Sequence, residues 1–396
     1  MLEFRQTQEV AVMDLDTVIA RARQVAVEVL GPEARSVDEE RRWPEPGIRA
    51  LQDTRLTSLT IPKSQGGLGY GLLALARVCE ELGRECASTS ICFGMHAVGA
   101  AVIAAKATST QQGQLLQSIA QGKHITSLAL SEPGTGTHFY YPQTKLSADG
   151  SGSLRLSGTK CFVTNGGHAN SYVVSTVSAD PDAPPGHFSC VVLPADTKGM
   201  HWGSQWLGMG MRGNSSRSLE LNDVQIPTEN LLGKEGDQIW YVFNVITPYF
   251  LVAMAGTYLG VASAALDEAK TNVKERRHQH SGALLAENQV IQHRMGTLWA
   301  NVARTRALLY RAASSGDEGN SDALLGLFSA KAEVAECAVD VVGQAMALSG
   351  GRGYRGGSEL HRMLRDVQAS HIMAPSTDTL RSWTGRALLG LPILSD

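Results

Sequence analysis

The spacing of apolar residues changes twice along this chain of 396 residues, and each change separates regions of different secondary structure. Up to Gly122, apolar residues recur at helical spacing. From there to about Gly233 they alternate between turn clusters, as in short strands, and helical spacing returns after Gly236. The pattern predicts an α+β protein with an N-terminal helical domain (residues 1–122), a middle small β-barrel or sandwich (123–233) and a C-terminal four-helix bundle (234–396).

Individual helices are placed by apolar spacing and by the turn residues between them. In the C-terminal region we expect four long helices, with a loop over residues 314–320. The predicted helical segments are residues 14–30, 42–54, 72–105 with one or more breaks, 250–277, 283–313 and 322–348, followed by a helix that begins near Ser376.

Composition indicates an ordinary globular protein. The chain is 43% hydrophobic, and its 35 Lys and Arg residues are outnumbered by 38 Asp and Glu residues, which argues against nucleic-acid binding. No apolar run approaches the ~20 residues of a membrane span, and residues 1–5 do not resemble a signal peptide. The six cysteines are scattered without a Cys-x-x-Cys pair, which favours free thiols. We therefore predict a cytoplasmic protein.

Two neighbouring segments of the middle region carry the groups that suit a flat ligand. An apolar strand, Ser127–Leu130, runs into the hydroxyl-rich loop Ser131–Thr137, in which Gly134 and Gly136 allow backbone amides to approach a ligand. A second strand, Lys160–Thr164, brings the aromatic ring of Phe162. Together these predict a site for a polar ring system, although each loop taken singly is also an ordinary turn.

Three other features are better explained by structure than by ligand binding. Gly66 to Gly69 lack the Gly-x-Gly-x-x-Gly spacing of a nucleotide loop and are predicted to join helices. His96 lies among apolar residues and is predicted to pack within a helix. His278 and His280 form a His-x-His without a third ligand nearby, so we predict no metal site.

The sequence Ser131-Glu-Pro-Gly-x-Gly-Thr137, followed by Phe162-Val-Thr-Asn165, resembles the flavin-binding middle domain of the acyl-CoA dehydrogenases. Further similarities are Gly208–Gly213, Val224–Pro227 and Arg365-Asp366, so the resemblance extends from about Arg42 onward. It implies the three-domain fold of that family, bound FAD and a homodimer or homotetramer. The implied cofactor contacts are Leu128, Leu130, Ser131, Gly136, Thr137, Phe162, Thr164, Arg276, Gln289, Gly350, Gly351, Ser376 and Asp378.

Part of that set is supplied in the family by a neighbouring subunit. Arg276 matches an arginine that reaches the flavin pyrophosphate, a contact suited to a guanidinium fork. Gln289, Gly350 and Gly351 match further contacts of this kind. Ala347 stands where a glutamine is usual, which departs from the family pattern.

The segment Arg365–Asp378 departs from the family at its catalytic base. Counting on from Arg365-Asp366 brings the family glutamate that removes the α-proton onto Ala374, which cannot accept a proton. Some members keep this glutamate on the first bundle helix, where Phe250 and Leu251 stand in this chain. The resemblance therefore implies a flavoprotein whose usual base position is vacant.

A second chemistry of the same fold needs no such base. Flavin monooxygenases of this fold take reduced flavin from a separate reductase and activate O2 in a dry pocket. Our first hypothesis is a two-component FAD monooxygenase that hydroxylates a small aromatic or amine-bearing metabolite. Donors would come from Ser131, Thr164, Ser376 and Thr377, and the pocket would be lined by Trp240, Tyr249, Phe250 and Met373.

Two alternatives remain open. The first is an acyl-CoA or acyl-carrier-protein dehydrogenase with a relocated base, for which Asp378, Glu359, His371 and His138 are candidates. Its support is that the Ser131–Thr137 loop is closer to true dehydrogenases than to most hydroxylases of this fold. The second is a non-catalytic subunit of a hetero-oligomer, which would be expected to lose its flavin contacts as well.

Overall fold

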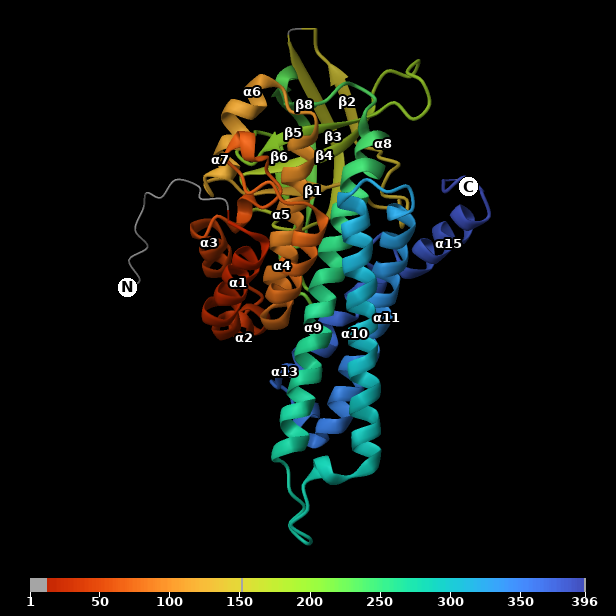
Figure 1. Cartoon of the computed structure of the whole chain (residues 1–396). Coiled ribbons are helices and arrows are strands. Elements are labelled where there is room, and N and C mark those ends of the chain that lie inside the picture. Colours follow the sequence, from red (N-terminus) through yellow and green to blue (C-terminus); the bar gives the residue numbers. More distant parts are fainter. Residues whose placement is uncertain (1–12, 151, 395–396) are drawn as a thin grey trace.

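The computed structural model describes residues 13–150 and 152–394. Residues 1–5, where we predicted no signal peptide, lie outside this part. Figure 1 shows helices at the N-terminal end, strands at the top and a long bundle that extends below them. The predicted order of a helical, a β and a second helical part is confirmed.

The first part is a packed group of helices. Cys86 adopts an extended conformation and breaks the long predicted helix over residues 72–105 into α4 and α5. Helix α5 is almost entirely buried and lies between α4, α9 and strand β1. The elements are α1 (Leu15–Val25), a π turn (Ala26–Leu30), α2 (Gly31–Glu39), α3 (Glu45–Asp53), α4 (Leu72–Glu85), α5 (Ala87–Ala105), α6 (Ser109–Gln111), a second π turn (Gln112–Leu116) and α7 (Gln117–Ala120).

The middle part is an eight-stranded sheet with the order β6-β7-β3-β2-β4-β5-β8, in which β1 pairs in parallel with β4. The predicted strand over Lys160–Thr164 is the end of a longer strand, β3, which begins at Ser153 and continues through Gly158 with a register shift. The strands are β1 (Thr126–Ala129), β2 (Lys145–Ala148), β3 (Ser153–Val163), β4 (Ser171–Ser178), β5 (Phe188–Pro194), β6 (Met200–Trp202), β7 (Arg217–Pro227) and β8 (Leu231–Leu232).

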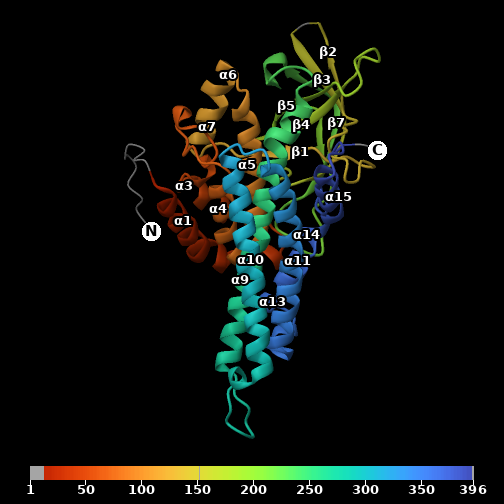
Figure 2. The ribbon, with the colours of Figure 1, turned by 45° about the vertical axis from the view of Figure 1, so that its right-hand side comes forward.

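The C-terminal part contains three long helices rather than four. Figure 2 shows the short α13 and α15 beside α11, and contacts between these elements agree with that view. The fourth predicted long helix, α15, has only 12 residues. The elements are α8 (Gln238–Tyr241), a π turn (Val242–Ile246), α9 (Thr247–Glu275), α10 (Gln289–Asp317), α11 (Ala323–Ser349), α12 (Gly351–Tyr354), α13 (Glu359–Val367), α14 (Ala369–Ile372) and α15 (Thr377–Leu388).

Helix α10 begins and ends later than predicted. Its start is fixed by Asn288, whose side chain caps the helix by accepting from the Val290 amide at 2.9 Å. Its last residues, 314–317, belong to the segment that we predicted as a loop. The helix continues through them because the Asp317 side chain has hydrogen-bond partners on α4. The Asp317 carboxylate accepts from the Leu72 and Leu73 amides at 2.5 and 2.9 Å and so caps α4.

Two helical stretches are long and apolar enough to span a membrane by length and composition, namely Ala87–Ala105 and Gln238–Glu275. Their most apolar windows are 94% and 83% buried inside the protein. They are therefore core helices, which fits a soluble protein.

His96 connects α5 to the sheet. It is buried, its Nδ1 atom accepts from the Thr126 amide at 3.1 Å, and its Nε2 atom lies 2.8 Å from the Thr57 carbonyl. The ring is therefore neutral, with its proton on Nε2. As predicted, it is a packed helix residue, and burial lowers the pKa of His96 from 6.5 to about 4.

We expect this histidine to make the protein sensitive to acid. Since the folded state resists protonation, the stability present above pH 6.5 should fall by about 2 kcal/mol between pH 6.5 and pH 5 through His96 alone. Between pH 6.5 and pH 5, the free energy of unfolding of the H96Q variant should fall by about 2 kcal/mol less than that of the wild-type protein. Urea unfolding at the two pH values measures this difference. The other acid-sensitive groups are present in both proteins, so their contributions cancel when the two losses of stability are compared. Equal pH-dependent losses in the two proteins would contradict this role.

Candidate active site

A cavity of about 730 Å³ lies where the loops that follow β1 and end β3 meet helices α9 and α14. Its wall includes residues from all three parts of the chain. Nine residues that the sequence analysis assigned to the site line this cavity: Leu128, Leu130, Ser131, Gly136, Phe162, Thr164, Phe250, Met373 and Ala374. Segments that are far apart in the sequence thus form one site.

The loop after β1 presents open backbone amides. Gly134 and Gly136 have φ values of 86° and 54°, a conformation that favours glycine, and an added Cβ at either would meet no atom within 4 Å. Within the described residues, the amides of Ser131, Gly134, Gly136 and Thr137 donate to no acceptor. These amides are free to bind polar atoms of a ligand.

A buried ion pair that the sequence analysis missed holds this loop. The Lys160 Nζ atom lies 2.5 Å from Glu132 Oε1, and both side chains are buried. Glu132 also accepts from the Gln143 and Thr144 amides at 2.7 and 3.1 Å. Burial alone would raise the pKa of Glu132, but Lys160 and the Thr144 donors hold this pKa below its usual value. The carboxylate is thus fixed as a structural anion.

Two buried donors of the cavity wall have no partner. The indole Nε1 of Trp206 and the hydroxyl of Thr247 make no hydrogen bond within the described residues. The exposed ring of Phe162 meets Trp206 edge to face, with ring centroids 6.2 Å apart. Phe162 has a φ of 55°, which turns its ring out of the sheet and into the cavity.

The described residues of the cavity wall include no free acid or base. Among the described residues, its ionisable side chains are Glu132, which is fully engaged, and Cys161, whose pKa is raised by burial. In the described part of the chain, no Lys, Arg or His side chain lines the wall. The four candidate relocated bases lie outside the cavity wall. Glu359 pairs with Arg362, and His371 bonds to Thr377. His138 packs against Tyr140 and Tyr141, and Asp378 is in the first turn of α15.

Ala374 is held at the cavity by a lysine. The Nζ atom of Lys331, on α11, donates to the carbonyls of Met373 and Pro375 at 3.3 and 3.0 Å, on either side of Ala374. The side chain of Lys331 is buried, and burial lowers its pKa from 10.5 to about 8. The segment that contains Ala374 is therefore well fixed.

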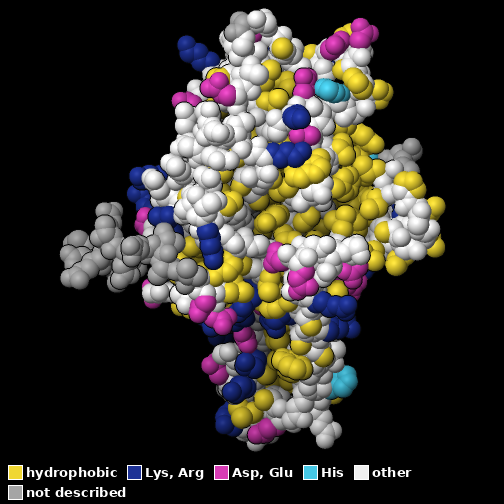
Figure 3. All heavy atoms as spheres, turned by 45° about the horizontal axis from the view of Figure 1, so that its top comes forward, with side chains coloured by type: hydrophobic (Ala, Val, Ile, Leu, Met, Phe, Trp, Pro, Cys, Tyr) yellow, Lys and Arg dark blue, Asp and Glu magenta, His cyan; other side chains and the backbone are white. Residues whose placement is uncertain are grey.

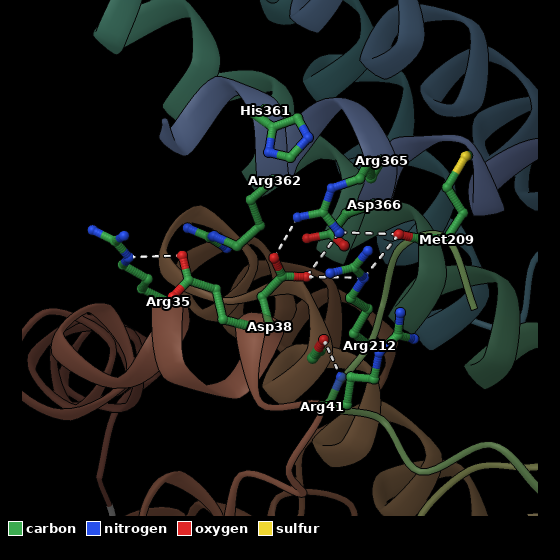
Figure 4. A network of polar contacts seen from close by, with 12 residues as sticks. Arg35, Asp38, Arg41, Met209, Arg212, His361, Arg362, Arg365 and Asp366 are labelled. Atoms are coloured by element: carbon green, nitrogen blue, oxygen red, sulfur yellow. Dashed lines mark hydrogen bonds and ion pairs between the residues drawn. The ribbon is translucent and has the colours of Figure 1, made fainter. Parts of the chain in front are cut away.

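A charged network docks the loop that contains Met211 onto the first domain and the bundle (Figure 4). Arg365 of α13 donates to Asp38 of α2 at 2.9 Å and to the Met209 carbonyl at 3.0 Å. Asp366 accepts from the Met211 amide at 2.6 Å. The Arg-Asp pair recognised in the sequence thus fixes one wall of the cavity.

Ser376 and Thr377, predicted as catalytic donors, do not line the cavity. The Ser376 hydroxyl caps α15 by accepting from the Thr379 amide at 3.3 Å, and the Thr377 hydroxyl lies 3.0 Å from His371 Nδ1. Their hydroxyls are used within the C-terminal part itself. Thr137 and Asp378, predicted as flavin contacts, are also outside the cavity wall.

Trp240 and Tyr249, predicted to line the substrate pocket, lie elsewhere. Trp240 is on α8, with the Lys106 ammonium 3.8 Å from the centre of its ring. Tyr249 precedes Phe250 on α9, and one residue turns the side chain by about 100° around a helix. Phe250 therefore faces the cavity and Tyr249 packs against the core.

The other predicted flavin contacts gather at the far end of the bundle. Figures 1 and 2 show the α9–α10 connection at the end of the molecule away from the strands. Arg276 follows α9, Gln289 begins α10, and a Cβ added at Gly350 would lie 3.3 Å from Arg276 Nη1. Arg276 lies 26 residues after Phe250, or roughly 39 Å along a helix. One chain therefore does not bring these residues to its own cavity.

Aromatic side chains extend from the cavity to the surface. Phe139 lines the cavity and packs edge-on against Tyr140, which also contacts Tyr141 and Trp383. Figure 3 shows hydrophobic side chains gathered on the surface between the strands and α15. The surroundings of the cavity are therefore apolar as well as its wall.

Sequence comparisons match each part of this architecture. Family models for the N-terminal, middle and C-terminal domains of acyl-CoA dehydrogenase match residues 14–123, 127–224 and 249–389. The chain belongs to the acyl-CoA dehydrogenase family. It is 29% identical over 368 residues to cyclohex-1-ene-1-carbonyl-CoA dehydrogenase of Geobacter metallireducens, covering 93% of this chain and 96% of that protein. It is 28% identical to the probable acyl-CoA dehydrogenase fadE25 of Mycobacterium leprae, covering 93% and 94%.

A solved structure agrees with this family. Butyryl-CoA dehydrogenase from Megasphaera elsdenii superposes with a TM-score of 0.89 at 25% identity, covering 97% of this chain and all of that one. Members of the family bind FAD. The open amides after β1, the unpartnered Trp206 indole and the outward ring of Phe162 fit such a cofactor. The protein is therefore an oxidoreductase of the acyl-CoA dehydrogenase family.

Proposed function

We propose that this family member is a two-component monooxygenase that hydroxylates a small aromatic or amine-bearing metabolite. The observation that carries the proposal is that no described residue of the cavity wall supplies a free carboxylate or imidazole. Ala374, which the sequence resemblance matches to the family's base position, lines this wall. α-Proton abstraction needs a positioned base, whereas oxygen insertion needs a dry pocket and donors. The hydroxyls of Ser131 and Thr164 and the apolar side chains of the wall support the second requirement, and no free base among the described residues of the wall supports the first.

The residues expected to hold the FAD ring system are Leu128, Leu130, Ser131, Gly136, Phe162 and Thr164. Reduced FAD from a separate flavin reductase would supply two electrons, so that one atom of O2 enters the substrate and the other leaves as water. Phe250, Met373 and Ala374 would border the substrate and exclude water. We also infer that the reaction takes place in the cytoplasm.

The relatives' names favour a second function. They are called acyl-CoA dehydrogenases, so we carry acyl-CoA or acyl-carrier-protein dehydrogenation as the alternative. It requires a base that reaches the substrate, and the four candidates named from the sequence lie outside the cavity wall. Under this alternative, one of them must move to the cavity when substrate binds.

Anaerobic spectroscopy of the FAD-loaded protein separates the two functions. Acyl-CoA thioesters, beginning with butyryl-CoA, are added while the visible band of oxidised flavin is followed. A monooxygenase should leave the band unchanged, and it should consume O2 with NADH only when a flavin reductase is present. Prompt bleaching by a thioester would overturn the monooxygenase proposal and favour the dehydrogenase.

We propose further that the protein acts as a homodimer or a dimer of dimers. In an antiparallel pair, the bundle end with Arg276, Gln289, Gly350 and Gly351 would reach the partner's cofactor, which explains why these residues lie far from the cavity of their own chain. Arg276 is exposed, and among the described residues its guanidinium has no hydrogen-bond or ion-pair partner, so the fork is available for a diphosphate.

Replacing Arg276 by alanine should weaken FAD binding by about tenfold or more, because a charge-assisted hydrogen bond to the diphosphate is lost. R277A is the matched control, since the neighbouring Arg277 donates to the Gly282 carbonyl of its own loop at 2.9 Å. Fluorescence titration with FAD measures affinity, and sedimentation measures mass. A monomer that binds FAD tightly, or an R276A variant with unchanged affinity, would refute the shared site.

A further inference from the structure

Thr247 carries a buried hydroxyl that the protein leaves without a partner. Its side chain is 1% exposed, and its Oγ1 atom has no hydrogen-bond partner within the described residues. The residue lines the cavity, on the same face of α9 as Phe250 one turn later. A buried hydroxyl without a partner is costly, so a ligand atom is the natural acceptor for its proton.

Three other buried hydroxyls in the long helices bond within their own helix. Thr257, Ser263 and Thr305 each donate to the carbonyl four residues earlier, at 2.9, 2.8 and 2.7 Å. Thr247 directly follows the π turn Val242–Ile246, and its amide bonds five residues back to Val242. π turns of this kind are frequent at functional sites. The irregular turn therefore leaves this one hydroxyl available to the cavity.

The surroundings of Thr247 determine what kind of atom it can bind. Ile246, Phe250 and Met95 form an apolar wall, and the other unpartnered group, Trp206 Nε1, can only donate. Within the described residues, the wall has no cation to neutralise an anion and no free carboxylate to neutralise an ammonium group. An uncharged acceptor is thus the complementary partner.

We propose that Thr247 determines specificity by donating a hydrogen bond to an uncharged carbonyl oxygen of the substrate. This inference rests on the proposed function, whose substrate class it narrows from aromatic or amine-bearing compounds to neutral carbonyl compounds. The flavin is expected against the opposite wall, at Leu130, Ser131 and Phe162. Thr247 on the helical wall would therefore face the substrate.

A pair of probes with the same shape tests the proposal on the FAD-loaded protein. Acetophenone carries the carbonyl oxygen, and α-methylstyrene replaces that oxygen by a methylene group. Dissociation constants are measured by ligand-observed NMR titration. We expect the wild-type protein to bind acetophenone about tenfold more tightly than α-methylstyrene, the ratio expected for one hydrogen bond in a dry site.

Three variants test whether the Thr247 hydroxyl causes the preference for acetophenone over α-methylstyrene. T247V keeps the shape of the side chain and should bind the two probes equally, within about twofold, whereas T247S should keep the preference. T257V is the matched control, because Thr257 is buried on the same helix and bonds internally to the Ala253 carbonyl. Thermal unfolding of each variant checks that it is folded, and FAD titration checks the cofactor.

The proposal is overturned if T247V keeps the preference, if the wild-type protein shows none, or if neither probe binds. It is also overturned if T247V loses FAD affinity, because the hydroxyl would then serve the cofactor. Bleaching by acyl-CoA thioesters is a separate readout. A protein that is bleached yet loses its carbonyl preference in T247V would refute the monooxygenase and leave the role of Thr247 intact.

Discussion

Replacing Lys160 by methionine should destabilise the protein by about 3–5 kcal/mol and abolish FAD retention. Lys160 is fully buried, and its ammonium group lies 2.5 Å from Glu132 and 2.6 Å from the Ser175 carbonyl. Methionine would fill a similar volume but leave the Glu132 carboxylate buried without its counter-ion. Because Glu132 begins the loop that presents the open amides, the loss should reach the cofactor site as well as the core.

Urea unfolding and FAD titration measure the two effects. The matched control is K145M, since Lys145 is an exposed lysine on the neighbouring strand β2. The double variant K160M/E132Q removes both charges and should recover much of the lost stability, because a neutral buried pair carries a smaller desolvation cost. A K160M protein as stable as K145M would show that this pair contributes little to the fold.

Only one half of the Lys160–Glu132 ion pair could be predicted from the sequence. Lys160 falls in phase with the buried Leu154 and Leu156 along β3, so strand alternation alone points its side chain inward. The burial of Lys160 is therefore predictable from its position along the strand. Its partner could not be named, because Glu132 lies 28 residues earlier in a loop whose path depends on the whole sheet.

More of the predicted flavin contacts near Ser131 and Phe162 line the cavity than of the residues predicted for the substrate pocket. The loop around Ser131 and the strand end at Phe162 carry their own turn chemistry, so they can be located from local sequence. Which face of α9 meets the cavity is decided by packing, so Phe250 lines the cavity while Tyr249 packs against the core. Ser376 does not line the cavity, and its hydroxyl caps α15 instead.

The ends of the long helices also depend on contacts with distant parts of the chain, which the local sequence does not show. Their existence follows from apolar periodicity, but the end of α10 depends on Asp317, whose partners are the Leu72 and Leu73 amides of another domain. Likewise, the separation of Arg276 from the cavity becomes apparent only once α9 is seen as one continuous helix. This separation supports the proposal that two chains share each cofactor site.

Introducing a glutamate at Ala374 should create acyl-CoA dehydrogenase activity. Ala374 lines the cavity, and Lys331 holds the carbonyls on both sides of it, so a longer side chain at this position would project from a fixed segment. The apolar surroundings should raise the pKa of the new carboxyl group and improve it as a base. Restoring a positioned base is expected to raise the rate of anaerobic flavin bleaching by butyryl-CoA about 10²–10⁴-fold.

A374Q is the matched control, because glutamine has the same size as glutamate and cannot accept the α-proton. Stopped-flow absorption at saturating butyryl-CoA compares the wild-type protein, A374E and A374Q after each has been shown to retain FAD. If A374E gains bleaching and A374Q does not, the missing base alone separates this chain from dehydrogenation. If the wild-type protein already bleaches as fast as A374E, a base reaches the substrate from outside the observed cavity wall, and the monooxygenase proposal fails. If a folded, FAD-loaded A374E stays inactive, the cavity is built for a substrate that does not carry its α-carbon to this position.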